Sequence, residues 1–329
     1  MVEVKSINSL MKYMRDEHNI KIEGSTHKNK LRNMGYYHGF KGYRFIKESK
    51  NTLKFNNFNE IIAMNKLDAD LKSIIYPKIM LIETSIKNRV LENILLDCKK
   101  SDFNSIYEQA LTGYKEFKKT NERKGKLINR LKLRDQILSS LTREFSKGKK
   151  VIEHFYSKEL NVPIWAIFEV ITMGELGNFI SCLKKELRVK ISKDINLNTS
   201  VDTNGILLQN IIFLLKDLRN AVAHNNIVFD IRFKTSNANE KLKKAFSFDI
   251  GINYDENDNF FTNIFDYVIL IIYLLKGLGI SKKELKKFIS DFESITEEFR
   301  NNIDVSIYNR IFTSSLKYRI KIIKEFIKK

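Results

Sequence analysis

Glycine, proline and cysteine are scarce in this chain. Its 329 residues include only 13 Gly, 2 Pro and 2 Cys. Turn-rich β architectures need many more glycines and prolines to reverse direction repeatedly, so the composition favours helices. Cys98 and Cys182 lie far apart in sequence and lack metal-ligand spacing, so we expect neither a disulfide framework nor a zinc site. A reducing compartment fits this usage of cysteine.

Long apolar runs are also missing. The longest, YVILIIYLL at residues 267–275, is about half as long as a membrane-spanning helix, so it predicts a buried core helix and no membrane partner. The N-terminal segment MVEVKSINSLMKYMRDEHN alternates charged and apolar residues, which is not the pattern of a signal peptide. We therefore expect a cytoplasmic protein.

Positive charge and apolar side chains are both abundant. The 58 Lys and Arg residues exceed the 39 Asp and Glu residues by 19, and such a surplus repels itself unless an anionic partner is nearby. RNA, DNA and acidic membranes are the candidate partners. A hydrophobic content of 43% with 23 Phe residues is enough for a substantial core, so the chain should fold.

Apolar residues at helical spacing predict an all-α protein. The expected helices cover residues 5–23, 59–96, 163–170, 207–222, 261–278, 281–299 and 303–328, with Pro77 kinking or breaking the second. Two segments depart from this pattern. Residues 24–45 place four glycines among five aromatics, which predicts a compact non-helical stretch, and residues 246–254 alternate like a short strand or extended loop.

These elements suggest three regions. Residues 1–57 would hold an N-terminal helix and the Gly-aromatic segment. Residues 58–235 would form a helical core with a basic insertion at 115–150, and residues 236–329 a C-terminal helical region packed on that core.

The insertion is the densest long basic stretch of the chain. It holds 13 Lys or Arg residues and 4 acids, with leucines threaded between them as on a basic amphipathic helix. Two interpretations stay open, a solvated helix face and a surface that follows RNA. The candidate RNA-binding residues are Lys118, Lys119, Arg123, Lys124, Lys126, Arg130, Lys132 and Arg134.

The segment RNAVAHNN contains the residues best suited to chemistry. Arg219, Asn220 and His224 bring a permanent cation, an amide and an imidazole within six residues. Cleaving RNA through its own 2′-hydroxyl needs a base, an acid for the leaving 5′-oxygen and positive charge on the phosphate. Histidine exchanges protons near neutral pH and arginine holds phosphate oxygens, so this chemistry needs neither metal nor cofactor.

The position of this segment in its helix decides whether the groups can meet. Residues five apart on an ideal helix point about 140° away from each other, so Arg219 and His224 converge only where the helix ends or distorts. Asn225 and Asn226 are a stop signal, which places Arg219 to His224 in the last turn. A second copy would supply an acid as well as a base, so we expect a homodimer.

Structural roles compete with the catalytic one. An isolated His224 could simply be a capping cation at a helix C-terminus. A second formal match, Arg32 to His38, lies in the Gly-aromatic segment with no preceding apolar helix to position it. We therefore assign His38 to structure or to stacking on RNA bases.

Several segments, taken in order, resemble one family. They are GYYHGFKGYRF near the N-terminus, the long helix with Ile82-Glu83 and Arg89, a block with Pro163, Trp165, Glu169, Gly174 and Leu176, and LKDLRNAVAHN. In this combination the chain resembles the Abi family of bacterial phage-defence proteins, the AbiD/AbiF-like group, which contains a HEPN domain. The chain departs from the family pattern at Asn225, where many members carry a second histidine.

The resemblance implies fold and function. It implies a HEPN-type helical bundle with additional N- and C-terminal helices, and catalytic roles for Arg219, Asn220 and His224. It also implies abortive infection through a toxic ribonuclease, restrained in some members by a small noncoding RNA. The alternative is an RNA-binding protein that holds a structured noncoding RNA or a toxin–antitoxin partner without turnover. A DNA-binding regulator is weaker, because no helix-turn-helix pair with a polar recognition face is evident.

Four other residues are given structural roles or left open. Trp165 and Phe168 lie on an apolar stretch and are expected in the core. Glu83 and Glu169 are expected as buried glutamates paired with Arg or Tyr, which could also place them behind the active site.

Overall fold

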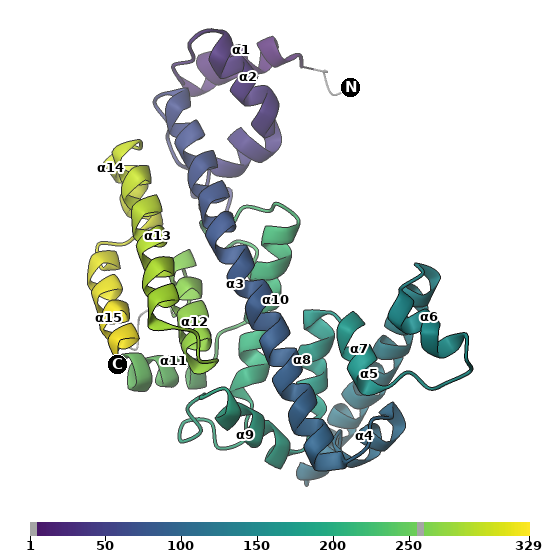
Figure 1. Cartoon of the computed structure of the whole chain (residues 1–329). Coiled ribbons are helices and arrows are strands. Elements are labelled where there is room, and N and C mark those ends of the chain that lie inside the picture. Colours follow the sequence, from purple (N-terminus) through teal and green to yellow (C-terminus); the bar gives the residue numbers. More distant parts are fainter. Residues whose placement is uncertain (1–4, 255–259) are drawn as a thin grey trace.

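The computed structural model describes residues 5–254 and 260–329 and confirms the all-α prediction. Within these ranges the chain forms fifteen α-helices and no β-strand, with only three isolated β-bridges. Figure 1 shows one long helix, α3 (Phe58–Cys98), as the axis of the molecule. The N-terminal helices lie at one end of α3, helices α4 to α9 surround the other end, and α12 to α15 lie along one side.

Helix α3 is a continuous rod of 41 residues. Asn57 and Glu60 form a capping box at its start, and Lys99 in a left-handed conformation ends it. The prediction of a break at Pro77 is wrong, because the helix runs through that residue. Proline costs about 3 kcal/mol inside a helix. Packing offsets this cost, since Ile75 and Ile79 on either side of Pro77 are fully buried.

The prediction of a non-helical segment at residues 24–45 is also wrong for most of its length. After α1 (Ile7–His18), the chain forms α2 (Gly24–Met34) and a π-helical turn, η1 (Gly35–Lys41). The glycines there permit close contacts within a helical region. A Cβ on Gly39 would lie 2.6 Å from the Met34 side chain, and one on Gly42 would lie 2.5 Å from Ile227.

The middle of the chain folds as a lobe of shorter helices around the far end of α3. Its elements are α4 (Phe103–Gln109), the short 3-10 helix η2 (Gly113–Glu116), α5 (Thr120–Ser146), α6 (Lys150–Tyr156), α7 (Ile164–Val170), α8 (Met173–Cys182) and α9 (Lys185–Asp194). Helix α8 packs against both α5 and α10 (Leu207–Ala223). The lobe therefore connects the basic helix α5 to the helix that carries Arg219.

The C-terminal region packs against α3 through two helices, α12 and α13. This region contains α11 (Glu240–Ala245), η3 (Phe246–Ile250), α12 (Ile264–Gly277), α13 (Lys282–Asn301), α14 (Val305–Ile311) and α15 (Leu316–Lys328). Helix α12 contains the run at 267–275 and is buried along nearly its whole length. No helix in the described ranges is both long and apolar enough to cross a membrane.

Two expectations for this region are wrong. The segment at residues 246–250 is the π-helical η3, because Phe246 and Ile250 are buried four residues apart, as in a helix, while Phe248 is exposed. The rest of that prediction falls in residues 251–254, which form neither helix nor strand and so fit its alternative of an extended loop. The single helix expected at 303–328 is divided into α14 and α15.

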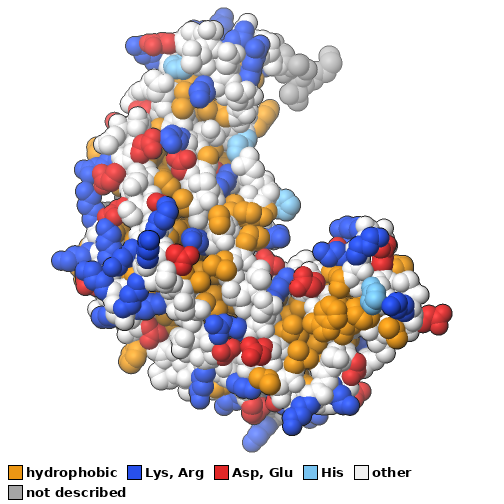
Figure 2. Space-filling model, viewed as in Figure 1, with side chains coloured by type: hydrophobic (Ala, Val, Ile, Leu, Met, Phe, Trp, Pro, Cys, Tyr) orange, Lys and Arg blue, Asp and Glu red, His pale blue; other side chains and the backbone are white. Residues whose placement is uncertain are grey.

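Apolar side chains gather on the surface of the lobe. Figure 2 shows this patch over the part of the molecule that carries α5, α6 and α7. Phe145, Tyr156 and Leu160 are exposed there, and Trp165 is 43% exposed, so its expected place in the core is wrong. Helix α7 buries Ile164, Ile167 and Phe168 on one face and turns Trp165 outward, where it contacts Phe155 with ring centroids 5.5 Å apart. The core prediction for Phe168 is confirmed.

Candidate functional site

The candidate catalytic residues lie at the C-terminal end of α10. His224 is the C-cap, which confirms that Arg219 to His224 occupy the last turn. Asn225 adopts a left-handed conformation with φ 54°, and its N–H donates to the Val222 carbonyl at 3.1 Å. The N–H of Asn226 donates to the Ala221 carbonyl at 2.7 Å. This is a Schellman motif, in which asparagine is the usual substitute for glycine.

Helix α3 holds this end of α10 in place. The buried carboxylate of Asp68 accepts the N–H groups of Val228 and Phe229 at 2.7 and 3.2 Å. Lys72, one turn along α3, forms an ion pair with Asp68 Oδ2 at 2.6 Å and donates to the Asn225 amide oxygen at 2.8 Å. The residue that follows His224 is therefore tied directly to the axis of the molecule.

Arg219 is directed by a carboxylate of α3. Its Nε lies 3.8 Å from Glu83 Oε2, and Glu83 also pairs with Lys87 at 3.1 Å. Lys87 in turn donates to the Ile171 carbonyl at 2.7 Å. The guanidinium keeps free donors, since Nη1 makes only a long 3.4 Å contact with Asn220 Oδ1 and the side chain is 36% exposed. Such donors can hold phosphate oxygens.

His224 is exposed to solvent, so its imidazole is not sealed in the interior. Within the described ranges its ring makes no hydrogen bond to protein, Arg219 included. Arg219 and Asn220 are brought together by the 3.4 Å contact, while His224 stands at the end of the same turn. The last turn of α10 therefore carries a partly exposed cation, an exposed amide and an exposed imidazole.

The two glutamates expected behind the site differ. Glu83 is mostly buried and contacts Arg219, as described above. Glu169 is exposed, and its side chain makes no hydrogen bond or ion pair within the described ranges. The expectation of a buried, paired glutamate is therefore confirmed for Glu83 and wrong for Glu169.

A cleft beside the end of α10 was not predicted from the sequence. It has a volume of about 460 Å³ and brings His38 and Lys30 from the N-terminal helices to Lys72 of α3 and to Asn225. Burial lowers the pKa of His38, the positive charge of Lys72 lowers it further, and Asp68 opposes them. The second Arg-to-His match in the sequence, Arg32 to His38, was the only available signal for this cleft.

All eight candidate RNA-binding residues lie on α5 or in the segment that precedes it. Lys118, Lys119, Arg123, Lys124, Lys126, Lys132 and Arg134 are exposed, whereas Arg130 is partly buried. The Arg130 guanidinium lies 3.6 Å from the centroid of the Tyr107 ring and donates to the Tyr107 carbonyl at 2.6 Å. Arg130 therefore has a structural role, and the other seven cations project to solvent.

Metal-binding and thiol chemistry find little support in the described residues. They contain no group of three or more His, Cys, Asp or Glu side chains arranged to hold a metal ion. Cys98 and Cys182 are unpaired and buried. Burial raises the pKa of both thiols, which disfavours the reactive thiolate form.

Comparison with known proteins identifies the family. A family model described as Abi-like protein matches residues 29–230, which is more than half of the chain. The chain therefore belongs to the Abi-like protein family, and this membership implies a role in abortive infection, a form of bacterial defence against phage. The match includes the second half of α2 and the whole of α3 and α10. No curated protein and no solved structure matches the chain.

Proposed function

We propose that this protein is a metal-independent endoribonuclease of abortive infection, built on a HEPN-type bundle and acting in the cytoplasm. The observation that carries the proposal is the end of α10, where an exposed His224 follows a partly exposed Arg219 directed by Glu83. The group needed for proton exchange and the group needed for phosphate charge thus lie on one accessible turn.

In the proposed reaction, a 2′-hydroxyl oxygen attacks the adjacent phosphorus while His224 takes its proton. The bond to the 5′-oxygen breaks, and that oxygen receives a proton from an acid. The products are a 2′,3′-cyclic phosphate and a 5′-hydroxyl. Arg219 stabilises the negative charge that grows on the phosphate, and Asn220 adds an amide at the same edge.

We further propose that the acid is the His224 of a second copy, which makes the active species a homodimer. Each chain has one imidazole at the end of α10, and one imidazole cannot start as both base and acid in a single step. Light scattering on the purified protein measures its molar mass in solution, which distinguishes a monomer from a dimer. A monomer at the concentrations used for cleavage would contradict this part of the proposal.

The test is cleavage of RNA in the presence of EDTA. We expect the wild type to cut and to leave 2′,3′-cyclic phosphate ends, and His224→Ala and Arg219→Ala to abolish cutting. His154→Ala is the matched control, because His154 is also exposed but lies on α6. Expression of the wild type and His224→Ala in cells, with growth and RNA integrity compared, tests the same proposal in vivo. Loss of activity with EDTA, or full activity of His224→Ala, refutes it.

A non-catalytic RNA-binding protein is the second candidate, because seven exposed cations line α5 and the segment before it. In this case the protein would hold a structured noncoding RNA, or a toxin–antitoxin partner, without turnover. Mass spectrometry of RNA copurified with the wild type and with the Arg219→Ala/His224→Ala variant separates the two. Intact RNA of uniform size in both samples favours binding alone.

A further inference from the structure

The cleft beside Asn225 combines segments that are far apart in sequence. Its lining comes from α2 and η1 on one side, from α3 on the other, and from the residue after His224 at one edge. The residues that line it include the polar side chains of Lys30, Asn33, His38, Asn65, Lys72 and Asn225. A volume of about 460 Å³ falls within the range of about 300–1,000 Å³ typical of sites for small ligands.

The cleft offers hydrogen-bond donors and positive charge. Asp68 is its one carboxylate; Oδ1 accepts two backbone N–H groups, and Oδ2 forms an ion pair with Lys72 at 2.6 Å. Because Lys72 occupies the Asn225 amide oxygen, the amide NH₂ of Asn225 remains as a donor. Lys30 is exposed and forms no ion pair within the described ranges. An anion entering the cleft would therefore meet donors and no free carboxylate.

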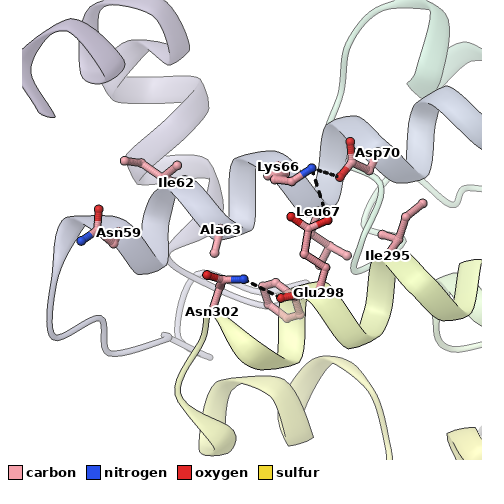
Figure 3. A pocket seen from close by; sticks show the side chains of 10 residues that line it. Asn59, Ile62, Ala63, Lys66, Leu67, Asp70, Ile295, Glu298 and Asn302 are labelled. Carbon is pink, nitrogen blue, oxygen red and sulfur yellow. Dashed lines mark hydrogen bonds and ion pairs between the residues drawn. The ribbon is translucent and has the colours of Figure 1, made fainter. Parts of the chain in front are cut away.

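The neighbouring cleft on the other side of Lys66 has the opposite character. Figure 3 shows Lys66 turned into that cleft, where it pairs with Asp70 at 2.8 Å and with Glu298 at 3.5 Å. Its floor is apolar, and both of its acids belong to α3 and α13. A phosphate would be repelled there, so the choice between the two clefts follows from charge.

We infer that the cleft lined by Lys30, His38 and Asn225 binds an RNA phosphodiester that flanks the bond at Arg219 and His224. The inference rests on the proposed function, because only a nuclease has a scissile bond at Arg219 and His224. Asn225 directly follows His224 and therefore joins the two sites. Lys30 supplies the charge, and His38 and the Asn225 amide supply hydrogen bonds. His38 is a binding residue in this scheme and takes no part in proton transfer.

The lowered pKa of His38 suits this role. Burial and Lys72 favour its neutral form, with Asp68 opposing, so at neutral pH the ring has one N–H donor and one acceptor. A neutral imidazole can accept a hydrogen bond from a 2′-hydroxyl on one side and donate one to phosphate on the other. DNA lacks this hydroxyl, so the cleft should prefer RNA.

Binding to a catalytically inactive protein tests the inference directly. In the His224→Ala background, Lys30→Ala/His38→Gln should raise the Kd for a short unstructured RNA oligonucleotide about tenfold. The slope of log affinity against log salt should shrink by about 0.7, the value for one lost single-strand phosphate contact. The same variant should change the Kd for the matching DNA oligonucleotide less. Fluorescence anisotropy measures all three quantities.

Matched controls make the result specific to the cleft. Lys28→Ala/His154→Ala removes a lysine of the same helix and an exposed histidine of α6, and it should leave the Kd and the slope unchanged. Lys30→Ala alone removes an exposed side chain without threatening the fold, and it should raise the Kd about threefold. A Kd and slope equal to those of the parent in both cleft variants would overturn the inference.

A failure of the RNA-binding proposal for the cleft and a failure of the nuclease proposal give different experimental results. If the wild type cuts RNA, Lys30→Ala/His38→Gln should raise KM with kcat nearly unchanged, because the flanking contact is the same in substrate and transition state. An unchanged KM in an active enzyme overturns the cleft alone. If the wild type does not cut, the nuclease proposal fails, and the anisotropy series still decides whether the cleft binds RNA.

Discussion

Glu83 and Arg219 face each other across the interface between α3 and α10. Glu83 Oε2 and Arg219 Nε lie 3.8 Å apart, and both atoms are buried without a hydrogen bond. A shift of less than an ångström would join them, which is within the movement of two flexible side chains. The carboxylate therefore sets the direction of the guanidinium while leaving its outer donors to a ligand.

Glu83→Gln should reduce RNA cleavage about tenfold, mainly in kcat, because Arg219 loses the charge that directs it. The decisive measurement is a double-mutant cycle. In an Arg219→Lys background with measurable activity, the same Glu83→Gln change should have a clearly smaller effect. Equal effects in the two backgrounds would assign Glu83 a purely structural role. Glu169→Gln is the matched control, since Glu169 is exposed and unpaired within the described ranges.

Asp68→Ala should destabilise the fold by about 3–5 kcal/mol, as expected when one partner of a buried ion pair is removed. The Asp68 side chain is fully buried, and its loss leaves Lys72 and two backbone N–H groups without their acceptor. Asp70→Ala removes a partly exposed ion pair with Lys66 and should cost less than about 1 kcal/mol. Urea denaturation measures the loss in free energy of unfolding for both variants. Similar losses would contradict the structural role assigned to Asp68.

Asp217 should make stability depend on acid pH. Burial alone would raise the pKa of Asp217, but hydrogen bonds from Ser236 at 2.6 Å and Thr235 at 2.8 Å, together with Lys216, outweigh burial and lower it. A group with a lowered folded pKa stabilises the fold above its unfolded value of about 3.9 and loses that contribution as pH falls through the folded pKa.

Asp217→Asn should therefore destabilise the protein by about 1–3 kcal/mol at pH 7. The difference from the wild type should shrink as pH falls below about 4. Asp291→Asn, which affects a more exposed pair with Lys287, is the control and should change little at any pH. Chemical denaturation from about pH 3 to about pH 7 measures the difference in the free energy of unfolding between the two proteins. A difference that stays constant with pH would contradict the lowered pKa of Asp217.

The exposed cations of α5 should contribute to RNA affinity through counterion release. Lys124→Ala/Lys132→Ala should weaken binding and reduce the slope of log affinity against log salt by up to about 1.4, the value for two single-strand phosphate contacts. Lys283→Ala/Lys286→Ala on α13 removes the same charge from another exposed helix. If both pairs reduce the slope equally, α5 is only a solvated face. A flat salt response in the wild type would count against both RNA hypotheses.

The sequence determined the helical class and the placement of the candidate chemistry in its helix. Apolar periodicity located α10, and two asparagines after His224 ended it at the predicted turn. These features depend on neighbours within about four residues along the chain, so the local pattern is sufficient to predict them. The same reasoning failed for residues 24–41 and for Pro77, where distant packing overrides local preference.

Only the tertiary structure decided what surrounds that turn. Glu83 meets Arg219 across 136 residues of sequence, and His38 shares a cleft with Asn225 because α3 holds both segments. Trp165 was expected inside and lies outside because one short helix has only one face to bury. Periodicity along a helix specifies which face is apolar, whereas the partner of that face depends on how α3 and α10 pack together.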